Sequence, residues 1–245
     1  LLLLANVTGS MVSGCLARRD MAFPFLVSSL SSFLNAVLVA CLVEEKKRRA
    51  AIEQPLFFKP IKEGLKHYVQ HRSLVILTLG SAFISIGVSC YFLGWQPYLQ
   101  QFGAGPEVLG ITYAIMSIGF SLGSFGGGKF AKRFNNKSGV IVGSLIGLGV
   151  FCLLLVRSTM FIIIFLLVLW ESGFGFHEPG RYAWLNEFIP SDIRATLLSL
   201  NRLLLVGGNT LGTLLAGFAA EFNLQLVFIM GAIAFLSSVS LFCTL

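Results

Sequence analysis

The sequence has few charged residues. Lys, Arg, Asp and Glu make up 12% of its 245 residues, whereas hydrophobic residues make up 56%, and the mean hydropathy is +0.83. Soluble chains carry about 25% charged residues, so about half of the usual solubilising surface is absent. This composition excludes an ordinary water-soluble domain.

The charged residues are unevenly distributed, so that long stretches of the chain contain no charged residue. A helix that crosses a bilayer needs about 20 mainly apolar residues, because about 30 Å of hydrocarbon is crossed at about 1.5 Å per residue. Eight charge-free stretches meet or nearly meet that length. We therefore predict an all-α, polytopic membrane protein with a helical bundle. Its spanning helices are expected near 1–17, 21–43, 74–99, 107–128, 138–156, 158–178, 195–220 and 224–245.

The sequence also lacks a cysteine pattern that would indicate a disulfide framework or a metal site. Its five cysteines occur singly in apolar segments and are interpreted as small core residues. The basic residues occur in short loops, so the net charge of +7 does not indicate a nucleic-acid partner. We expect the lipid bilayer as the main partner, and neither a metal nor a cofactor. The cysteines are Cys15, Cys41, Cys90, Cys152 and Cys243.

The chain starts and stops inside apolar segments. It begins with the run Leu1–Leu4 and ends equally abruptly at Leu245. We expect a fragment of a longer protein that is cut at both ends, with its N-terminal part missing.

A polar segment, 44–73, separates the first two predicted helices from the last six. Within it an apolar helical stripe lies opposite a basic face, and Pro60 suits a first helical turn. We predict an amphipathic helix on the membrane surface. The stripe consists of Ile61, Leu65, Tyr68 and Val69, and the opposite face of Lys62, Lys66 and His67.

The distribution of Lys and Arg sets the expected orientation. Fourteen basic residues fall in loops on the side of 44–73, and three, Arg18, Arg19 and Arg157, fall on the other side. Because cytoplasmic loops carry the excess of basic residues, 44–73 is predicted to be cytoplasmic. Trp95 and Tyr98 then fall near the outer membrane interface, where aromatic belts are expected.

Two charged residues interrupt apolar segments. Glu171 follows a charge-free run of thirteen residues, and Arg202 lies about two turns into the next predicted helix. Charges in hydrocarbon cost about 2.5–3.5 kcal/mol on insertion scales, so they are functional candidates. If the sixth helix ends near Pro179, the two lie at similar depth on antiparallel helices. His177 and Glu178, nearer the boundary, are interpreted as interfacial.

Such a pair has a chemical use. Burial favours a neutral carboxylic acid and a nearby guanidinium favours the carboxylate, so a movable pair of Glu171 and Arg202 is predicted to bind and release a proton. A static ion pair between the two helices is the alternative.

The seventh predicted helix carries a polar stripe that indicates a cavity rather than lipid. Aromatic residues in other helices are candidates to contact a substrate, although single aromatic residues in apolar helices commonly only pack. The stripe is Asn201, Arg202 and Asn209, and the aromatic candidates are Tyr91, Tyr113 and Trp170.

Small residues recur at four-residue spacing in three predicted helices. Such ladders let helix backbones approach closely. Tight packing is the expected role, and sliding surfaces are the alternative. The ladders are Gly119, Gly123 and Gly127; Gly139, Gly143 and Gly147; and Gly208, Gly212 and Ala216.

Two short matches to enzyme motifs do not indicate an enzyme. Residues 123–129 fit G-x-x-x-x-G-K, but Phe130 follows where a phosphate-binding loop needs Ser or Thr. Residues 119–123 fit G-x-S-x-G, but within a predicted membrane helix rather than a strand-to-helix turn. An intramembrane serine hydrolase would also need a histidine at the depth of Ser121.

Residues 189–200 follow the pattern IPSxxRATxLSL, with Pro190 and Arg194 as its landmarks, and lead into a Gly-rich helix. This pattern resembles the loop between the tenth and eleventh helices of major facilitator superfamily transporters. Residues 128–134 sit where that family repeats a loop signature, although its acidic residue is absent here. The eight helices would then be the fifth to twelfth of twelve.

The resemblance implies a domain organisation and a mechanism. Residues 1–43 would end the N-terminal six-helix half, 44–73 would be the cytoplasmic linker, and 74–245 the C-terminal half. The halves of such transporters rock around a central cavity to give alternating access. The expected function is secondary active transport of a small molecule across the cell (plasma) membrane, without enzymatic activity.

The direction of transport is less defined by the sequence. Residues 9–14 match an antiporter pattern, G-P-x-x-G-G, at only two of four key positions. Proton-coupled efflux of small amphipathic compounds is favoured, because the inferred cavity is aromatic and sparsely charged. Uptake of a sugar or an organic acid is the main alternative, and a multi-helix receptor and an intramembrane serine hydrolase are the others.

Overall fold

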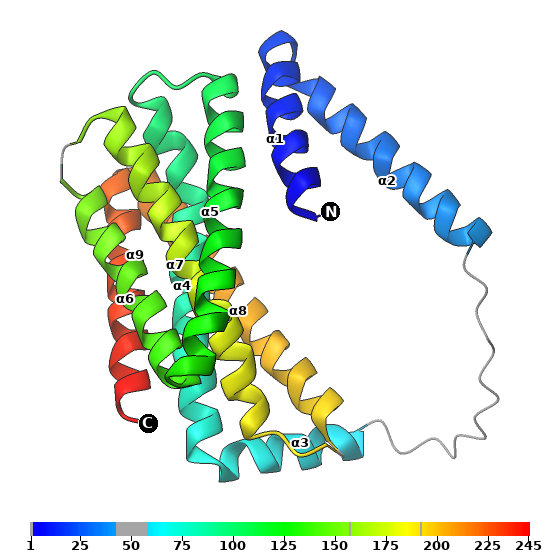
Figure 1. Cartoon of the computed structure of the whole chain (residues 1–245), viewed down its shortest axis with the longest axis vertical. Helices are drawn as coiled ribbons and strands as arrows, with labels where there is room; N and C mark the ends of the chain where they lie inside the picture. The colour runs from blue at the N-terminus through cyan, green and yellow to red at the C-terminus, as the bar shows by residue number, and fades with distance from the viewer. Residues whose placement is uncertain (1, 43–57, 157, 192) are drawn as a thin grey trace.

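The computed structural model of the chain describes residues 2–42, 58–156, 158–191 and 193–245, with Leu2, residues 58–61 and Glu63 described by their backbone alone. These residues form nine α-helices (Figure 1). They are α1 (Leu2–Arg19), α2 (Ala22–Leu42), α3 (Phe58–Gln70), α4 (Arg72–Gln100), α5 (Pro106–Arg133), α6 (Asn136–Leu154), α7 (Met160–Glu187), α8 (Arg194–Phe222) and α9 (Leu224–Cys243).

The all-helical prediction is confirmed, and each predicted spanning segment has a helix. Seven of the described helices, α2 and α4 to α9, are long and apolar enough to cross a membrane. The exception is α1, which is not among those seven. The predicted amphipathic helix is present as α3, whereas the charge run 44–49 lies outside the described residues.

Helices α4 to α9 form one bundle, with α3 lying across one of its ends (Figure 1). Helix α1 packs along α5, and α2 extends away from the bundle with none of its residues buried. The apolar side chains of α2 are therefore exposed in this chain.

Phenylalanine rings of α9 pack against glycines of α4 at three successive positions. Three glycines of α4 and three phenylalanines of α9 are each spaced seven residues apart, which places each set on one helix face. A Cβ at each glycine would meet the opposing ring, so the rings occupy space that only glycine leaves open. The pairs are Gly80 with Phe242, Gly87 with Phe235, and Gly94 with Phe228.

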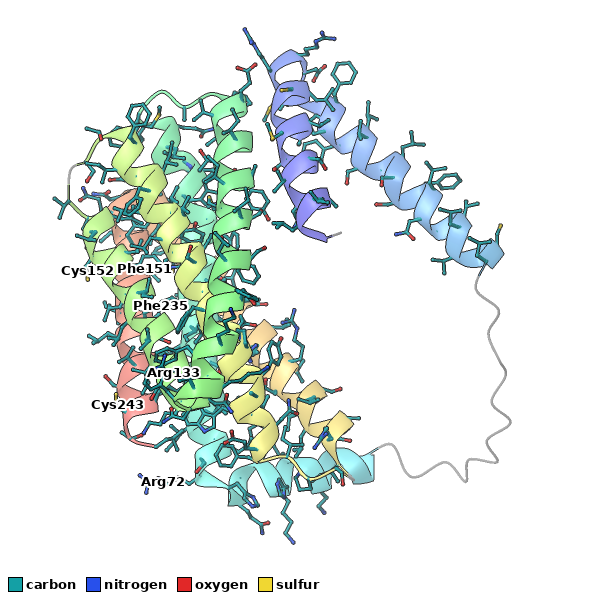
Figure 2. The ribbon with its side chains drawn as sticks, viewed as in Figure 1. Arg72, Arg133, Phe151, Cys152, Phe235 and Cys243 are labelled. Atoms are coloured by element: carbon teal, nitrogen blue, oxygen red, sulfur yellow. The ribbon has the colours of Figure 1, made fainter. Side chains whose placement is uncertain are left out.

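The same device continues between α6 and α9. The rings of Phe151 and Phe235 lie 5.6 Å apart at the centre of this contact (Figure 2). Phe151 faces Gly231 of α9, and Phe235 also faces Gly147 of α6. Both phenylalanines are buried, so the aromatic rings form the interior that the glycines admit.

The predicted small-residue ladders are confirmed as sites of close helix packing. A Cβ at Gly123 or Gly127 of α5 would meet the backbone of α7, and one at Gly143 of α6 would meet His177 of α7. A Cβ at Gly212 of α8 would meet the backbone of α4. These contacts hold α5 and α6 to α7, and α8 to α4.

One predicted helix end is wrong. Helix α7 continues through Pro179 to Glu187, so the connection to α8 is short and the expected loop 179–193 is largely helical. Proline removes its own N–H donor, but membrane helices tolerate it when neighbours restore local contacts. The next residue, Gly180, packs against the backbone of Asn136 on α6, which holds this part of α7 in place.

The aromatic residues near the end of α4 do not face lipid. Trp95 is 2% exposed, and Tyr98 donates its hydroxyl to the carbonyl oxygen of Leu154 at 3.0 Å. Both side chains are buried rather than forming a belt against lipid, because α6 and α9 supply partners for Tyr98 and Tyr113 of α5 stacks with Trp95.

Candidate functional site

A small cavity of about 90 Å³ lies between α4, α7 and α8. Its wall combines apolar side chains with three charged groups. The lining residues are Ser81, Ile84, Ser85, Val88, Phe174, Glu178, Arg181, Arg202, Leu205 and Asn209.

Two of the charges in this cavity pair with each other. Arg181 Nε donates to Glu178 Oε1 at 2.9 Å, and Arg181 Nη2 donates to Oε2 at 3.1 Å. The guanidinium is buried, and its Cζ lies 4.2 Å from the centroid of the Tyr182 ring. A bidentate pair of this kind satisfies both carboxylate oxygens, so Glu178 is already neutralised within α7.

His177 lies behind this pair. Its ring is 1% exposed, its Nδ1 lies 3.5 Å from Glu178 Oε1, and neither ring nitrogen makes a hydrogen bond to the described residues. The expectation that His177 and Glu178 are interfacial is therefore wrong for these side chains. Helix α7 runs two turns further than predicted, which leaves both inside the bundle.

Arg202 supplies the excess charge of the cavity. Its side chain lines the wall opposite α7, and it forms no ion pair within the part of the chain that the structure describes. One carboxylate and two guanidinium groups therefore share the cavity, which gives it a net positive charge.

Glu171 lies elsewhere on α7. It is 7% exposed and makes neither a hydrogen bond nor an ion pair with any described residue. The predicted pairing with Arg202 is absent from this conformation: Arg202 lines the cavity with Glu178 and Arg181, roughly two turns along α7 from Glu171. The longer α7 shifts the register of the two helices and explains the difference.

Two aromatic candidates lie beside Glu171 in the core. The rings of Tyr91 and Trp170 stack with centroids 3.6 Å apart, and both residues are fully buried. Tyr91 donates its hydroxyl to the carbonyl oxygen of Leu167 at 3.2 Å, whereas Trp170 Nε1 has no partner among the described residues. Neither ring lines a described cavity, so their contact with a substrate stays a prediction.

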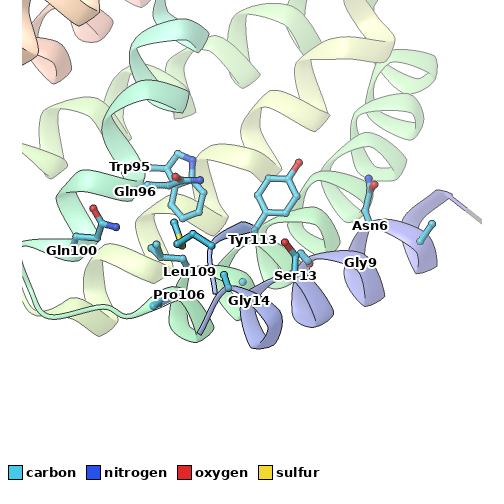
Figure 3. A pocket seen from close by; sticks show the side chains of 15 residues that line it. Asn6, Gly9, Ser13, Gly14, Trp95, Gln96, Gln100, Pro106, Leu109 and Tyr113 are labelled. Atoms are coloured by element: carbon cyan, nitrogen blue, oxygen red, sulfur yellow. The ribbon is translucent and has the colours of Figure 1, made fainter. Parts of the chain in front are cut away.

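The third aromatic candidate, Tyr113, lines a different cavity, of about 540 Å³, between α1, α4 and α5 (Figure 3). Its ring lies 6.3 Å from that of Trp95, centroid to centroid. The wall combines apolar residues such as Met21 and Leu109 with polar side chains that carry no charge. They include Asn6, Ser10 and Ser13 of α1 and Gln96 and Gln100 of α4.

The two asparagines of the predicted stripe separate. Asn201 is buried beneath α3, where its Nδ2 donates to the Tyr68 hydroxyl at 3.0 Å and to Thr78 Oγ1 at 3.1 Å. Asn209 instead lines the small cavity. The amide of Asn201 is thus used to attach α3, and only Asn209 keeps the predicted position at a cavity wall.

The loop motif contributes little to either cavity. Pro190 is exposed in the connection after α7, and Arg194 is the first residue of α8. Neither lines a described cavity. Their position is consistent with a connecting role between α7 and α8.

Three lining residues of these cavities are not among the site residues predicted from the sequence. Arg181 follows Pro179, where the sequence predicts a loop. Gln96 and Gln100 are uncharged, so the energetic cost of burying a charge does not single them out. A signal for Arg181 was available, since Glu178 precedes it by three residues, a spacing that pairs charges on one helix face.

Enzymatic features are not assembled. In the described residues no group of three or more His, Cys, Asp and Glu side chains is placed to hold a metal. Ser121 lies inside the continuous helix α5 and donates its hydroxyl to the carbonyl oxygen of Ser117 at 3.0 Å.

Comparison with known proteins agrees with this architecture. The sequence model described as Major Facilitator Superfamily matches residues 75–245. The chain is 25% identical over 256 residues to a protein of Bacillus subtilis (strain 168) named "Uncharacterized MFS-type transporter YxaM". The match covers 99% of this chain and 62% of that relative, so the chain spans about three-fifths of the relative's length.

Proposed function

Since the chain belongs to the Major Facilitator Superfamily, a family of multi-pass membrane transporters and not of enzymes, we propose that the full protein carries a small molecule by proton-coupled alternating access. Helices α1 and α2 would be the last two helices of the first six-helix half, and α4 to α9 would form the second half, with α3 in the cytoplasmic linker. The cell (plasma) membrane is the proposed location.

The observation that carries proton coupling is the environment of Glu171. Its side chain is buried, directly after Trp170 in the sequence, and has no partner among the described residues. An ionised group in such surroundings is costly, so intramembrane carboxyl groups of this kind mark proton or ion pathways. Glu171 is therefore the proposed proton carrier.

A closed contact between α1 and α5 supports alternating access. A Cβ on Gly110 would lie 2.6 Å from the carbonyl oxygen of Ser10, and one on Gly14 would lie 2.9 Å from that of Pro106. At the same end, Arg18 Nη1 donates to Glu107 Oε1 at 2.7 Å. In the proposed orientation this end is extracellular, so α1 and α5 would hold the two halves together on the outer side.

The direction of transport we propose is efflux of small amphipathic compounds. The cavity between α4, α7 and α8 combines Phe174 and Leu205 with the polar groups of Asn209 and Arg202, which fits a ligand with one apolar and one polar part. The opposite direction, uptake of a sugar or an organic acid, would use the same wall.

Vesicles with an imposed pH gradient test this proposal. Everted membrane vesicles containing the full-length protein are given an acidic interior and supplied with benzenesulfonate, benzenesulfonamide or phenyltrimethylammonium. We expect at least one probe to accumulate, and a protonophore to abolish its accumulation. Vesicles without the protein are the control.

Three other results would contradict parts of the proposal. Accumulation only in right-side-out vesicles with an acidic exterior would reverse the direction. Exchange of a probe without any response to the pH gradient would contradict proton coupling. No movement of any of the three probes would contradict efflux of amphipathic compounds.

A further inference from the structure

The charges of the cavity between α4, α7 and α8 do not balance. Its lining holds the side chains of Glu178, Arg181 and Arg202. Both oxygens of Glu178 accept from Arg181, which is 4% exposed. The guanidinium of Arg202, an exposed residue of α8 in this chain, is therefore the one left without a counter-charge among the described residues.

A second donor lies on the same helix face, seven residues further along α8. Ser89 Oγ donates to the backbone carbonyl oxygen of Asn209 at 2.9 Å, and Asn209 Oδ1 lies 3.3 Å from the same hydroxyl oxygen. Its N–H groups make no hydrogen bond to the residues that the structure describes. Arg202 and Asn209 thus offer donors to the cavity.

The hydroxyl groups nearby donate within their own helix. Ser81 Oγ donates to the carbonyl oxygen of Leu77 at 2.8 Å, and Ser85 Oγ donates to that of Ser81 at 3.1 Å. Such bonds within a helix leave the serine hydrogens engaged. The N–H groups of Arg202 and Asn209 are therefore the hydrogen-bond donors that this wall leaves for a ligand.

The remaining wall is apolar. Ile84 and Val88 of α4, Phe174 of α7 and Leu205 of α8 line it. A volume of about 90 Å³ is enough for an oxyanion head group, so the apolar part of a larger ligand would lie only partly inside the cavity in this conformation. A cation would find no free carboxylate in this wall, because Arg181 already binds Glu178.

We propose that this cavity binds an amphipathic organic anion, with its oxyanion head on Arg202 and Asn209 and its apolar part against Phe174 and Leu205. This names the substrate class of the proposed transporter and rests on that function. Arginine suits the role because its planar N–H fork matches an oxyanion and stays charged at all working pH values.

Equilibrium binding to the purified full-length protein tests the charge of the ligand. The probes share one phenyl ring: benzenesulfonate is anionic, benzenesulfonamide neutral and phenyltrimethylammonium cationic. We expect benzenesulfonate to bind about tenfold or more tightly than the sulfonamide, because a charge-assisted hydrogen bond is involved.

Variants at two arginines sharpen the test. Arg202→Gln should lose the preference for benzenesulfonate, and Arg202→Lys should keep part of it, because lysine retains the charge without the planar fork. Arg133→Gln, an exposed arginine at the end of α5 (Figure 2), is the matched control and should change nothing. Unchanged sulfonamide binding by Arg202→Gln would show that the variant is folded.

Several outcomes would overturn the inference. They are equal affinity of the wild type for the three probes, tighter binding of the cation, no measurable binding of benzenesulfonate, and full sulfonate preference in Arg202→Gln. Counterflow of the probes in proteoliposomes separates this from the proposed function. Arg202-dependent sulfonate binding without counterflow would contradict transport alone, whereas counterflow of the sulfonamide or the cation without dependence on Arg202 would contradict the anion site alone.

Discussion

The ring of Trp170 on α7 stacks on the ring of Tyr91 on α4, with 3.6 Å between the centroids and 11° between the planes. Trp170 also lies 5.4 Å from Phe174 and 6.3 Å from Phe151, centroid to centroid. This aromatic cluster fixes the part of α7 that carries Glu171. The candidate proton carrier thus lies on a helix that packs through aromatic rings.

Replacing Gly123 by alanine should destabilise the protein, because the new Cβ would overlap the carbonyl group of Ser172 on α7. Overpacking of this kind costs about 1–3 kcal/mol. Gly128 of the same helix has no atom within 4 Å of its Cβ position, so Gly128→Ala is the matched control. The thermal unfolding midpoints of the two variants in detergent measure the difference.

For the glycine pair, the control should unfold at or slightly above the wild-type midpoint, since alanine favours a helix over glycine by up to about 1 kcal/mol. Equal midpoints for Gly123→Ala and Gly128→Ala would contradict the close approach of α5 to α7.

Asn201→Leu should loosen α3 from the bundle. The asparagine donates to the hydroxyl groups of Tyr68 and Thr78, which also bond to each other. The loss should cost about 1–2 kcal/mol, and a double-mutant cycle with Tyr68→Phe should give a coupling of about 1 kcal/mol. Hydrogen exchange of the α3 amides reports the detachment, and Asn186→Leu, an exposed position, is the control.

Additive effects of Asn201→Leu and Tyr68→Phe, or unchanged exchange in α3, would mean that this buried cluster does not attach the helix. In that case the amide of Asn201 would be available for another role, such as the substrate contact expected from its place in the polar stripe.

Glu107→Gln should open the contact between α1 and α5, because it removes the carboxylate that Arg18 binds. The expected effect is faster labelling of Ser13→Cys by a membrane-impermeant thiol reagent added outside, in a full-length background whose native cysteines are serine. The swapped double variant Arg18→Glu with Glu107→Arg should restore slow labelling. Equal labelling rates in the parent protein, Glu107→Gln and the swapped double variant would show that this ion pair does not keep the contact between α1 and α5 closed.

The sequence was sufficient for the helices but not for the way charges meet. Charge-free length set the number and order of the helices, because the bilayer demands it. It missed the continuation of α7 past Pro179, since a proline weakens a helix only locally. With a helix end at Pro179, the sequence predicts Glu178 and Arg181 at or beyond the boundary of the bundle. It also predicts Arg202 at the depth of Glu171, whereas in the structure Arg202 shares a cavity with Glu178 and Arg181.

The packing partners were also beyond the sequence. The glycine ladder of α5 predicts a close helix contact, but it does not predict that α7 is the partner helix. The seven-residue match between Gly87 of α4 and Phe235 of α9 depends on which helices are neighbours, and no local pattern encodes that. Asn201 and Asn209 look equivalent on a helical wheel, yet α3 covers only the first.

Gradient-driven flux by Glu171→Gln in the full-length protein tests proton coupling most directly. The variant keeps the size and hydrogen-bonding groups of the side chain but carries no titratable proton, and Glu221→Gln, an exposed carboxyl group on α8, is the control. In proteoliposomes, flux of benzenesulfonate driven by a pH gradient should be abolished in Glu171→Gln, while exchange of the same probe without a gradient is largely kept. Full gradient-driven flux by Glu171→Gln would contradict Glu171 as the proton carrier.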